Sequence, residues 1–544
     1  MTRMTGGGAV VEMLRRHGVD TVFALPGVQN DALFVAFYDA GEALRIIHTR
    51  HEQGAAYMAH GYARASGRVG AYAVVPGPGL LNTTAALATA YATNAPVLCI
   101  SGQIPLDLIG RGWGLLHEIP DQLGILQRLT KWAARIGHPT ETGRLVNEAF
   151  RQLQDGRPRP VALEIPLDVM ARETEVELPP AAAAPAPTAP DPEQIEEAAD
   201  WLGAAAKPLI YVGSGAVGAA AEVLALAEML EAPVVSLSGG KGIVSDRHHL
   251  AQSALAGHQL WRETDVVLAV GTRLNQPQMR WGVDSAMKLI RIDIDPTEIN
   301  RILRPALGIV ADAKLTLAAL AGAVDRRNIR RASRRDELTA LKAQTYAGLK
   351  ERLGPQCEYL EAIRAELPEE GIFIEDLTQV GYASRVGLPI YRPRTYIHSG
   401  YQGTLGHGFA TALGAKVARP DLPVVSVSGD GGFMYNVQEL STAVRHGIDL
   451  VAIVFADGAY DNVRRMQKVD YGNRLIGVDL HNPNFARMAE TYDAAGVRVT
   501  TPAGLRTELA AALKRRGPSL IEVAVGEMPD PWPILQMPRV RARS

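Results

Sequence analysis

The sequence predicts an α/β protein of three domains, each with a parallel sheet flanked by helices. Two observations support this fold class. Apolar, β-branched runs of strand length alternate with helical stretches along the chain, a pattern typical of parallel α/β sheets. The chain has 544 residues, which is enough for three domains that each bury a core of their own.

Two segments of unusual composition mark the expected domain boundaries. Residues 179–192 are rich in proline and alanine, so they predict an extended linker. Residues 326–335 crowd arginines together, which indicates a solvated face or an interdomain connector. The expected segments are domains at 1–178, 193–325 and 361–544, with a connector at 326–360.

Charge and cysteine content narrow the class of protein. The chain has 56 Lys and Arg against 58 Asp and Glu, so nothing favours nucleic acid or a membrane surface as a partner. Cys99 and Cys357 stand far apart and outside any metal-ligand spacing, as expected in a reducing compartment. The N-terminus shows no apolar signal segment, and no apolar run is long enough to span a bilayer. We therefore expect a cytoplasmic protein.

A Gly-Asp-Gly-Gly sequence at 429–432 suggests an anion site. It follows the apolar run 424–428, a predicted buried strand, and ligands of open parallel sheets bind at the carboxyl ends of strands. The glycines let the backbone approach a phosphate, and a helix is expected at 436–445 with its N-terminus toward that anion.

The next predicted strand, 450–455, brings Asp457 beside Asp430. Mg²⁺ takes few carboxylates and completes its shell with phosphate, carbonyl and water oxygens. Two such carboxylates next to a diphosphate therefore predict a Mg²⁺ site, although a Gly-Asp-Gly turn alone also fits an acidic loop after a strand.

A second motif lies far away in the sequence. A predicted strand at 46–48 leads to Glu52, and a helix dense in small residues follows. Residues 74–79 form a glycine-rich turn before Asn82. By itself Glu52 would also fit an acidic residue that favours a helix N-terminus.

Together the two motifs resemble those of the thiamine-diphosphate (ThDP) enzymes of the acetolactate synthase, pyruvate oxidase and 2-oxo acid decarboxylase superfamily. The likeness runs from Gly27 to about Gly526. It implies pyrimidine-binding, central and diphosphate-binding domains in that order. It also implies that Glu52 hydrogen-bonds N1′ of the aminopyrimidine and drives the 4′-amino group to its imino tautomer, which removes the C2 proton. Such a carboxyl group must share a proton, which burial favours.

The same resemblance implies the other cofactor contacts. Leu405 would be the apolar wedge between the cofactor rings, and Gly403 would offer a carbonyl to the 4′-amino group; the stretch also fits a plain glycine-rich turn. Asp457 stands where the family usually has asparagine, so cofactor binding should depend more on the metal. The implied cofactor contacts are Glu52, Pro76, Gly77, Asn82, Thr378, Gln379, Gly403, Leu405, Gly429, Asp430, Gly431, Gly432, Asp457 and Ala459. The implied Mg²⁺ ligands are Asp430, Asp457 and the carbonyl of Ala459.

Gln29 and His117 are the further catalytic candidates. Gln29 lies in a segment that faces the thiazolium in relatives. His117 lies in a loop that carries a glutamine in acetolactate synthases, and imidazole groups suit proton transfer near neutral pH. A surface-loop role for His117 fits equally well.

The central domain contains a formal dinucleotide pattern, G-x-G-x-x-G at 213–218, after a predicted strand at 208–212. The next strand ends in Gly-Gly-Lys-Gly, without the acidic residue that binds a ribose, which argues against a nicotinamide cofactor. Some relatives bind FAD here. The segment 242–265 is shorter than theirs and lacks their Gly-Met-His-Gly stretch, which argues against FAD as well.

We expect a ThDP- and Mg²⁺-dependent enzyme that removes CO₂ from a 2-oxo acid, with the cofactor as electron sink. The resulting enamine would add to a second carbonyl, as in acetolactate synthases, or be protonated to an aldehyde; carboligation is placed slightly ahead. Flavin-dependent oxidation comes third, and a catalytically silent regulatory paralogue is a rival of another class. By resemblance, active sites would be shared across a homodimer that assembles into a tetramer.

Overall fold

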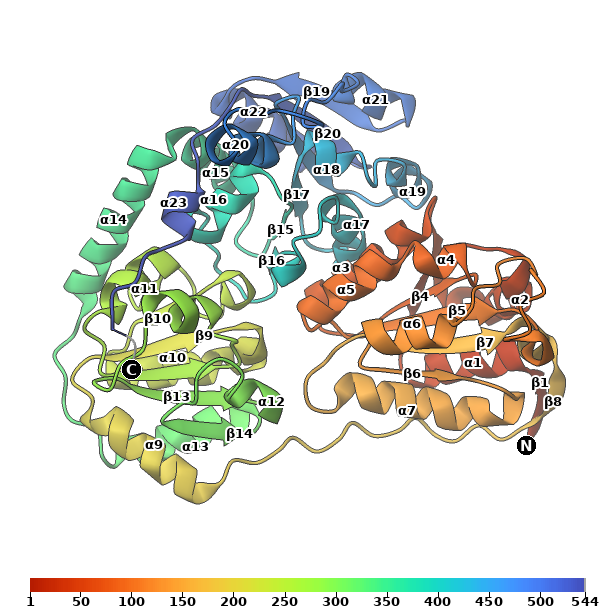
Figure 1. Ribbon diagram of the computed structural model, residues 1–544, viewed down its shortest axis with the longest axis horizontal. Helices are drawn as coiled ribbons and strands as arrows, with labels where there is room; N and C mark the ends of the chain where they lie inside the picture. Colours follow the sequence, from red (N-terminus) through yellow and green to blue (C-terminus); the bar gives the residue numbers. More distant parts are fainter. Residues whose placement is uncertain (543–544) are drawn as a thin grey trace. The chain divides into compact units, whose positions relative to one another are not determined.

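The computed structural model describes residues 1–542 and contains three six-stranded parallel sheets flanked by helices, which confirms the predicted fold class (Figure 1). The chain divides into two compact units. Unit 1 comprises residues 1–185, 399–499 and 508–524, and unit 2 comprises the rest of the described chain. Within residues 1–542, no helix is both long enough and apolar enough to cross a membrane.

The first sheet lies in unit 1 and has the strand order β3-β2-β4-β5-β7-β6, while β1 and β8 form a separate antiparallel pair. The strands are β1 (Thr2–Thr5), β2 (Thr21–Ala24), β3 (Arg45–His48), β4 (Gly70–Val74), β5 (Val97–Gln103), β6 (Trp132–Arg135), β7 (Val161–Pro166) and β8 (Glu173–Val176). The helices are α1 (Gly6–Arg16), α2 (Asp31–Ala40), α3 (Glu52–Ser66), α4 (Pro78–Leu81), α5 (Thr84–Ala92), α6 (Gln122–Leu129), α7 (Thr142–Gln154) and α8 (Leu167–Ala171).

Both faces of this sheet are covered by helices. The central strands β4 and β5 are therefore buried at every position. Helices α1, α2, α7 and α8 form one core with the strands. Helix α3 packs against β2, β4 and α17 (Gly408–Ala418), and its many small side chains allow this close packing. The helix that begins at Glu52 is therefore held along most of its length.

The central sheet lies in unit 2 and has the order β11-β10-β9-β12-β13-β14. Its strands are β9 (Pro208–Val212), β10 (Val234–Ser236), β11 (Ala251–Gln252), β12 (Val266–Val270), β13 (Lys288–Asp293) and β14 (Leu307–Val310). Its helices are α9 (Pro192–Ala204), α10 (Ala220–Leu230), α11 (Ala254–Trp261), α12 (Pro296–Ile299) and α13 (Ala313–Asp325). Helices α9, α10 and α13 pack together in one core with the strands (Figure 1).

The G-x-G-x-x-G segment begins a 3₁₀ turn after β9. There Gly213 and Gly215 pack tightly against Gly271 at the end of β12, and the Gly215 N–H donates to the Gly271 carbonyl (3.0 Å). The glycines therefore allow the backbone segments that follow β9 and β12 to pack closely against one another.

The two predicted connecting segments differ in character. Residues 177–191 contain no helix or strand, and α9 begins at Pro192. The arginines of the second segment make more hydrogen bonds and ion pairs than a solvated face would make. Arg331 donates to three backbone carbonyls at the end of α9, and Arg326 pairs with Glu196. Helix α14 (Arg335–Arg352) and the start of α15 (Gly354–Glu366) fill the rest of the predicted connector.

The third sheet has the order β16-β15-β17-β18-β20-β19. Its strands are β15 (Ile372–Glu375), β16 (Tyr396–Ile397), β17 (Val424–Gly429), β18 (Val451–Ala456), β19 (Ala495–Val499) and β20 (Ser519–Ala524). The helices around it are α16 (Gln379–Gly387), α17, α18 (Asp430–Phe433), α19 (Glu439–Arg445), α20 (Asp461–Asp470), α21 (Phe485–Thr491), α22 (Pro502–Ala512) and α23 (Trp532–Leu535).

The strands predicted at 424–428 and 450–455 are confirmed as β17 and β18, but the helix predicted at 436–445 is wrong at its start. A short helix, α18, forms directly at Asp430, and α19 begins only at Glu439. The intervening turn is fixed by Asn436, whose side chain donates to the Gly406 carbonyl (2.7 Å).

Candidate active site

Asp430 is held at the carboxyl end of β17, at the start of α18. Its side chain is buried, and one oxygen accepts from the Gly431 N–H (2.7 Å). The other oxygen accepts from the Gly458 N–H (2.8 Å) and from the Asn482 amide (2.6 Å). These three donors fix the carboxylate beside the turn that carries Asp457.

Asp457 has the electrostatics of a cation ligand. Burial, reinforced by the negative charge of Asp430, raises the pKa of Asp457 to about 7. Two neighbouring carboxylates that repel one another in this way fit a divalent cation, which would neutralise both. Among residues 1–542 no group of three or more His, Cys, Asp or Glu side chains could hold a metal ion. A cation here would therefore complete its shell with carbonyl, phosphate or water oxygens, as Mg²⁺ does.

The glycines after Asp430 leave room that larger residues would fill. A Cβ atom on Gly431 would collide with the ring of Tyr460, and one on Gly432 would lie 3.2 Å from Cδ1 of Leu405. Leu405 therefore lies next to the Gly-Asp-Gly-Gly segment. The start of α18 could face a diphosphate, because the backbone N–H groups of the first helical turn point toward that end.

Glu52 is the first residue of α3 and is half-exposed. Its carboxylate accepts from the Asn82 side-chain amide (3.0 Å). A Cβ atom on Gly79 would lie 3.5 Å from the other carboxylate oxygen. The structure thus brings together two predicted residues, Glu52 at the start of α3 and Asn82 at the end of α4.

A loop bearing His117 lies against the same turn. Gly77 has φ +59°, and a Cβ atom there would collide with the His117 carbonyl, so glycine is required. The buried Gln29 amide donates to the Leu116 carbonyl (3.0 Å) and tethers the loop from the other side. His117 itself has φ +67°, and its Nδ1 atom is buried without a hydrogen-bond partner. A strained histidine with an unpartnered ring nitrogen is a candidate for a functional proton donor or acceptor.

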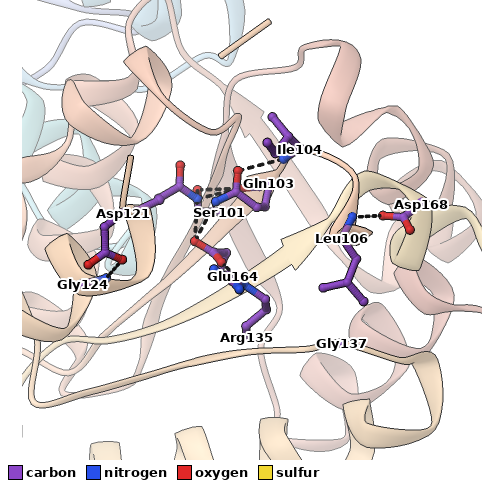
Figure 2. A network of polar contacts seen from close by, with 12 residues as sticks. Ser101, Gln103, Ile104, Leu106, Asp121, Gly124, Arg135, Gly137, Glu164 and Asp168 are labelled. Atoms are coloured by element: carbon purple, nitrogen blue, oxygen red, sulfur yellow. Dashed lines mark hydrogen bonds and ion pairs between the residues drawn. The ribbon is translucent and has the colours of Figure 1, made fainter. Parts of the chain in front are cut away.

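A buried polar network centred on Glu164 supports this loop (Figure 2). The fully buried Glu164 carboxylate accepts from the Gln103 amide (3.1 Å) and the Gln122 amide (3.0 Å), and it pairs with Arg135. The side-chain amide oxygen of Gln122 in turn accepts from the Gly77 N–H (2.9 Å). Gln122 therefore links a buried charge to the backbone of the turn at Gly77.

The described contacts gather the predicted residues of unit 1 in two groups. One group is Glu52, Gln29, Pro76, Gly77, Asn82 and His117. The other is Leu405, Gly429, Asp430, Gly431, Gly432, Asp457 and Ala459, and the part of Gly403, two residues before Leu405, stays a prediction. Thr378 and Gln379 open α16 in unit 2, and their part in the site stays a prediction.

Sequence reasoning missed three supporting residues: Asn482, Gln122 and Glu439. Asn482 precedes Pro483, a turn signal that says nothing about Asp430. Gln122 and Glu439 are buried polar residues on helices, and no local pattern distinguishes them from exposed ones. Their partners are distant in sequence, so only the fold reveals them.

Three family models described as thiamine pyrophosphate enzyme domains match the chain. The N-terminal TPP binding domain matches residues 4–125, the central domain 195–320 and the C-terminal TPP binding domain 376–523.

Curated relatives match over nearly the whole length. A probable 2-ketoarginine decarboxylase of Pseudomonas aeruginosa is 34% identical over 528 residues, which cover 96% of this chain and 94% of that protein. An acetolactate synthase of Arthrospira platensis is 33% identical over 575 residues, covering 98% and 96%. The acetolactate synthase isozyme 1 large subunit of Escherichia coli is 30% identical over 549 residues, covering 98% and 96%.

Proposed function

Because the chain belongs to the thiamine pyrophosphate enzyme family, we propose that it uses ThDP and Mg²⁺ to decarboxylate a 2-oxo acid. The observation that carries this proposal is the pair formed by Asp430, at the start of α18, and Asp457, directly after β18, with Gly431 and Gly432 beside it. Asp430, Asp457 and the Ala459 carbonyl would hold the cation, and the start of α18 would face the diphosphate.

When bound, ThDP supplies the electron sink that lets CO₂ leave. The chain's own residues orient and protect it. Glu52, whose carboxylate accepts from the Asn82 amide, would exchange a proton with a ring nitrogen of the aminopyrimidine. Leu405, next to Gly432, would be the apolar wedge between the two cofactor rings.

Two outcomes of the reaction are open to this site. The geometry at His117 favours protonation to an aldehyde, because an unpartnered imidazole nitrogen lies in the loop held against Gly77. The decarboxylase named above is consistent with this outcome. Carboligation to a second carbonyl, which the sequence placed slightly ahead, is the second candidate, and the acetolactate synthases among the relatives favour it.

We also propose that the active sites are shared between two subunits of a homodimer, which assembles further into a tetramer. The superfamily resemblance supports this arrangement, because the residues that it implies come from two domains of the chain, the first and the last. Mixed oligomers of Glu52→Gln and Asp430→Ala chains should then regain activity, since a hybrid dimer would leave one site intact. No gain on mixing would contradict shared sites.

A screen of 2-oxo acids for CO₂ release tests the function. The purified protein is supplied with ThDP and Mg²⁺, with and without an aldehyde or second 2-oxo acid as acceptor, and the panel includes pyruvate and 2-ketoarginine. CO₂ release with aldehyde formation supports the decarboxylase, whereas an acceptor-dependent product supports the carboligase. A chain that binds ThDP but releases no CO₂ from any member would support a silent paralogue instead.

A further inference from the structure

We propose that unit 2 contains a separate binding site for a small amphipathic carboxylate that also carries an O–H or N–H donor. The site is a pocket of about 370 Å³. It is lined by α14, by the ends of β10 and β11, by the start of α11 and by the end of α16. This volume lies within the range of small-molecule sites. None of the residues assigned to ThDP or Mg²⁺ lines the pocket.

The walls of the pocket are largely apolar. Leu349 on α14 faces Val386 and Leu388 at the end of α16, and all three side chains are buried. Leu255 on α11 contributes a further apolar wall. These walls suit a hydrocarbon or aromatic body, which would gain from leaving water.

Lys241 places a positive charge in this apolar setting. Its side chain is only 8% exposed. Its ammonium group donates to the Arg385 carbonyl at a long 3.4 Å and lies 5.6 Å from the centre of the Tyr396 ring. An ammonium group has three N–H donors, so Lys241 keeps donor capacity for a ligand.

Lys342 adds a second, fixed ammonium group. It donates to the carbonyls of Asp246 and His248, both at 2.8 Å, which leaves one N–H. Burial lowers the pKa of both lysines, and the charge of Asp246 opposes this shift.

The negative groups around the pocket do not balance the two lysines. The Asp246 carboxylate accepts from the Ile390 N–H (2.7 Å) and is the one carboxylate that lines the pocket. Glu375 also acts on Lys241, but it is paired with Arg385 (2.7 Å). Two ammonium groups therefore face one available carboxylate, so an anionic ligand would complete the charge balance.

Gln252 presents a buried side-chain oxygen that lacks a hydrogen-bond donor. The side chain is 1% exposed, and its NH₂ group donates to the carbonyls of His249 (2.7 Å) and Leu338 (3.1 Å). Because both partners are acceptors, the amide cannot be flipped. Its oxygen is left buried without a hydrogen-bond partner, a rare and costly state that a ligand O–H or N–H would relieve.

Three matched compounds test the proposal by calorimetry on the full chain. 4-Hydroxyphenylacetate offers a carboxylate, an aromatic body and a donor, and it should bind. Phenylacetate lacks the donor and should bind about tenfold more weakly, while tyramine replaces the carboxylate by an ammonium group and should not bind. Equal binding of all three, or no binding of 4-hydroxyphenylacetate, would overturn the proposal.

Variants locate the binding. Lys342→Met should weaken 4-hydroxyphenylacetate at least about tenfold, since a charge-assisted contact is lost. Lys416→Met is the matched control in unit 1, because Lys416 also donates to two carbonyls, those of Pro420 and Leu422 (2.9 Å each). Ala343→Trp, at an exposed position of α14 on the pocket, should block binding even if a lysine variant folds poorly. Wild-type affinity in folded Ala343→Trp would exclude this pocket.

The proposal is independent of the enzymatic function proposed above. Binding is measured with and without saturating ThDP and Mg²⁺, and in Asp457→Ala. Unchanged affinity supports a separate site. Loss of binding when ThDP is present would place the compound in the active site and overturn the proposal.

Discussion

The Glu439 carboxylate accepts hydrogen bonds from the backbone N–H groups of Arg50 (3.1 Å) and His51 (3.0 Å), directly before Glu52. Glu439 lies on α19 and is fully buried. The segment that follows Asp430 therefore holds the start of the helix that begins with Glu52. This contact joins the two motifs of the sequence within one chain.

Replacing Glu439 should be costly because it would leave two partly buried N–H groups without this acceptor. Each such loss costs about 1–3 kcal/mol when the group is fully buried, so for these partly buried groups Glu439→Ala should lower the free energy of unfolding by roughly 2 kcal/mol or more. Glu439→Gln keeps an acceptor and the shape of the side chain, so it should lose less. Urea unfolding measures both. Glu148→Ala, which removes an exposed ion pair with Arg151, is the control, and equal stability of the two alanine variants would refute the role of Glu439.

Asp457→Asn should change the pH dependence of the protein. Burial and the charge of Asp430 raise the pKa of Asp457 to about 7, against about 4 in an unfolded chain. Without a cation, the folded state keeps a proton that the unfolded state loses, so stability should fall as pH rises through this window. Mg²⁺ competes with the same proton, so its affinity should weaken as pH falls below about 7.

The asparagine variant cannot take up that proton, so both effects should be absent. Thermal unfolding of the cation-free protein and Mg²⁺ titrations at several pH values provide the measurements. Parallel pH profiles for wild type and Asp457→Asn would show that Asp457 is not the titrating group.

Asn482→Ala should weaken cofactor binding without removing a ligand. The Asn482 amide donates to the Asp430 carboxylate (2.6 Å) and orients it. Loss of such outer partners typically costs about 10–100-fold in metal affinity. Mg²⁺-dependent ThDP binding by calorimetry checks this. Asn484→Ala, at a nearby helix cap, is the control, and equal affinities in the two variants would contradict the orienting role.

Gln122 and Gln103 form a matched pair for testing the loop that bears His117. Both amides donate to Glu164, but only Gln122 also accepts from the Gly77 N–H. Gln122→Leu should therefore speed hydrogen exchange at Gly77 and reduce turnover, whereas Gln103→Leu should lower stability alone. Identical exchange at Gly77 in the two variants would show that Gln122 does not hold this turn.

The sequence predicted the elements that depend on local pattern. Apolar runs identified β17 and β18, because buried parallel strands carry β-branched residues at consecutive positions. The helix after Asp430 was misplaced, since the sequence contains no cap signal that separates α18 from α19. Glycine permits either helix or turn, and the Asn436 contact with Gly406 decides the outcome from a distance.

The motifs predicted only those parts of the site that follow a strand directly. Glu52 and Asp430 follow predicted strands, so their positions near strand ends could be predicted from the sequence. Glu439, Gln122 and Asn482 act through backbone and side-chain partners far along the chain. Such contacts depend on the packing of whole domains, which no local pattern encodes.

Exchange of the C2 proton of bound ThDP in Glu52→Gln tests the central claim most directly. Most of the cofactor affinity should come from the diphosphate and Mg²⁺ near Asp430, so the variant should still bind ThDP. Loss of the carboxyl group should slow H/D exchange at C2, followed by quenched-flow NMR, by at least about 100-fold, the lower range for general acid–base contributions. Exchange at the wild-type rate in Glu52→Gln would contradict the claim that this chain activates ThDP through Glu52.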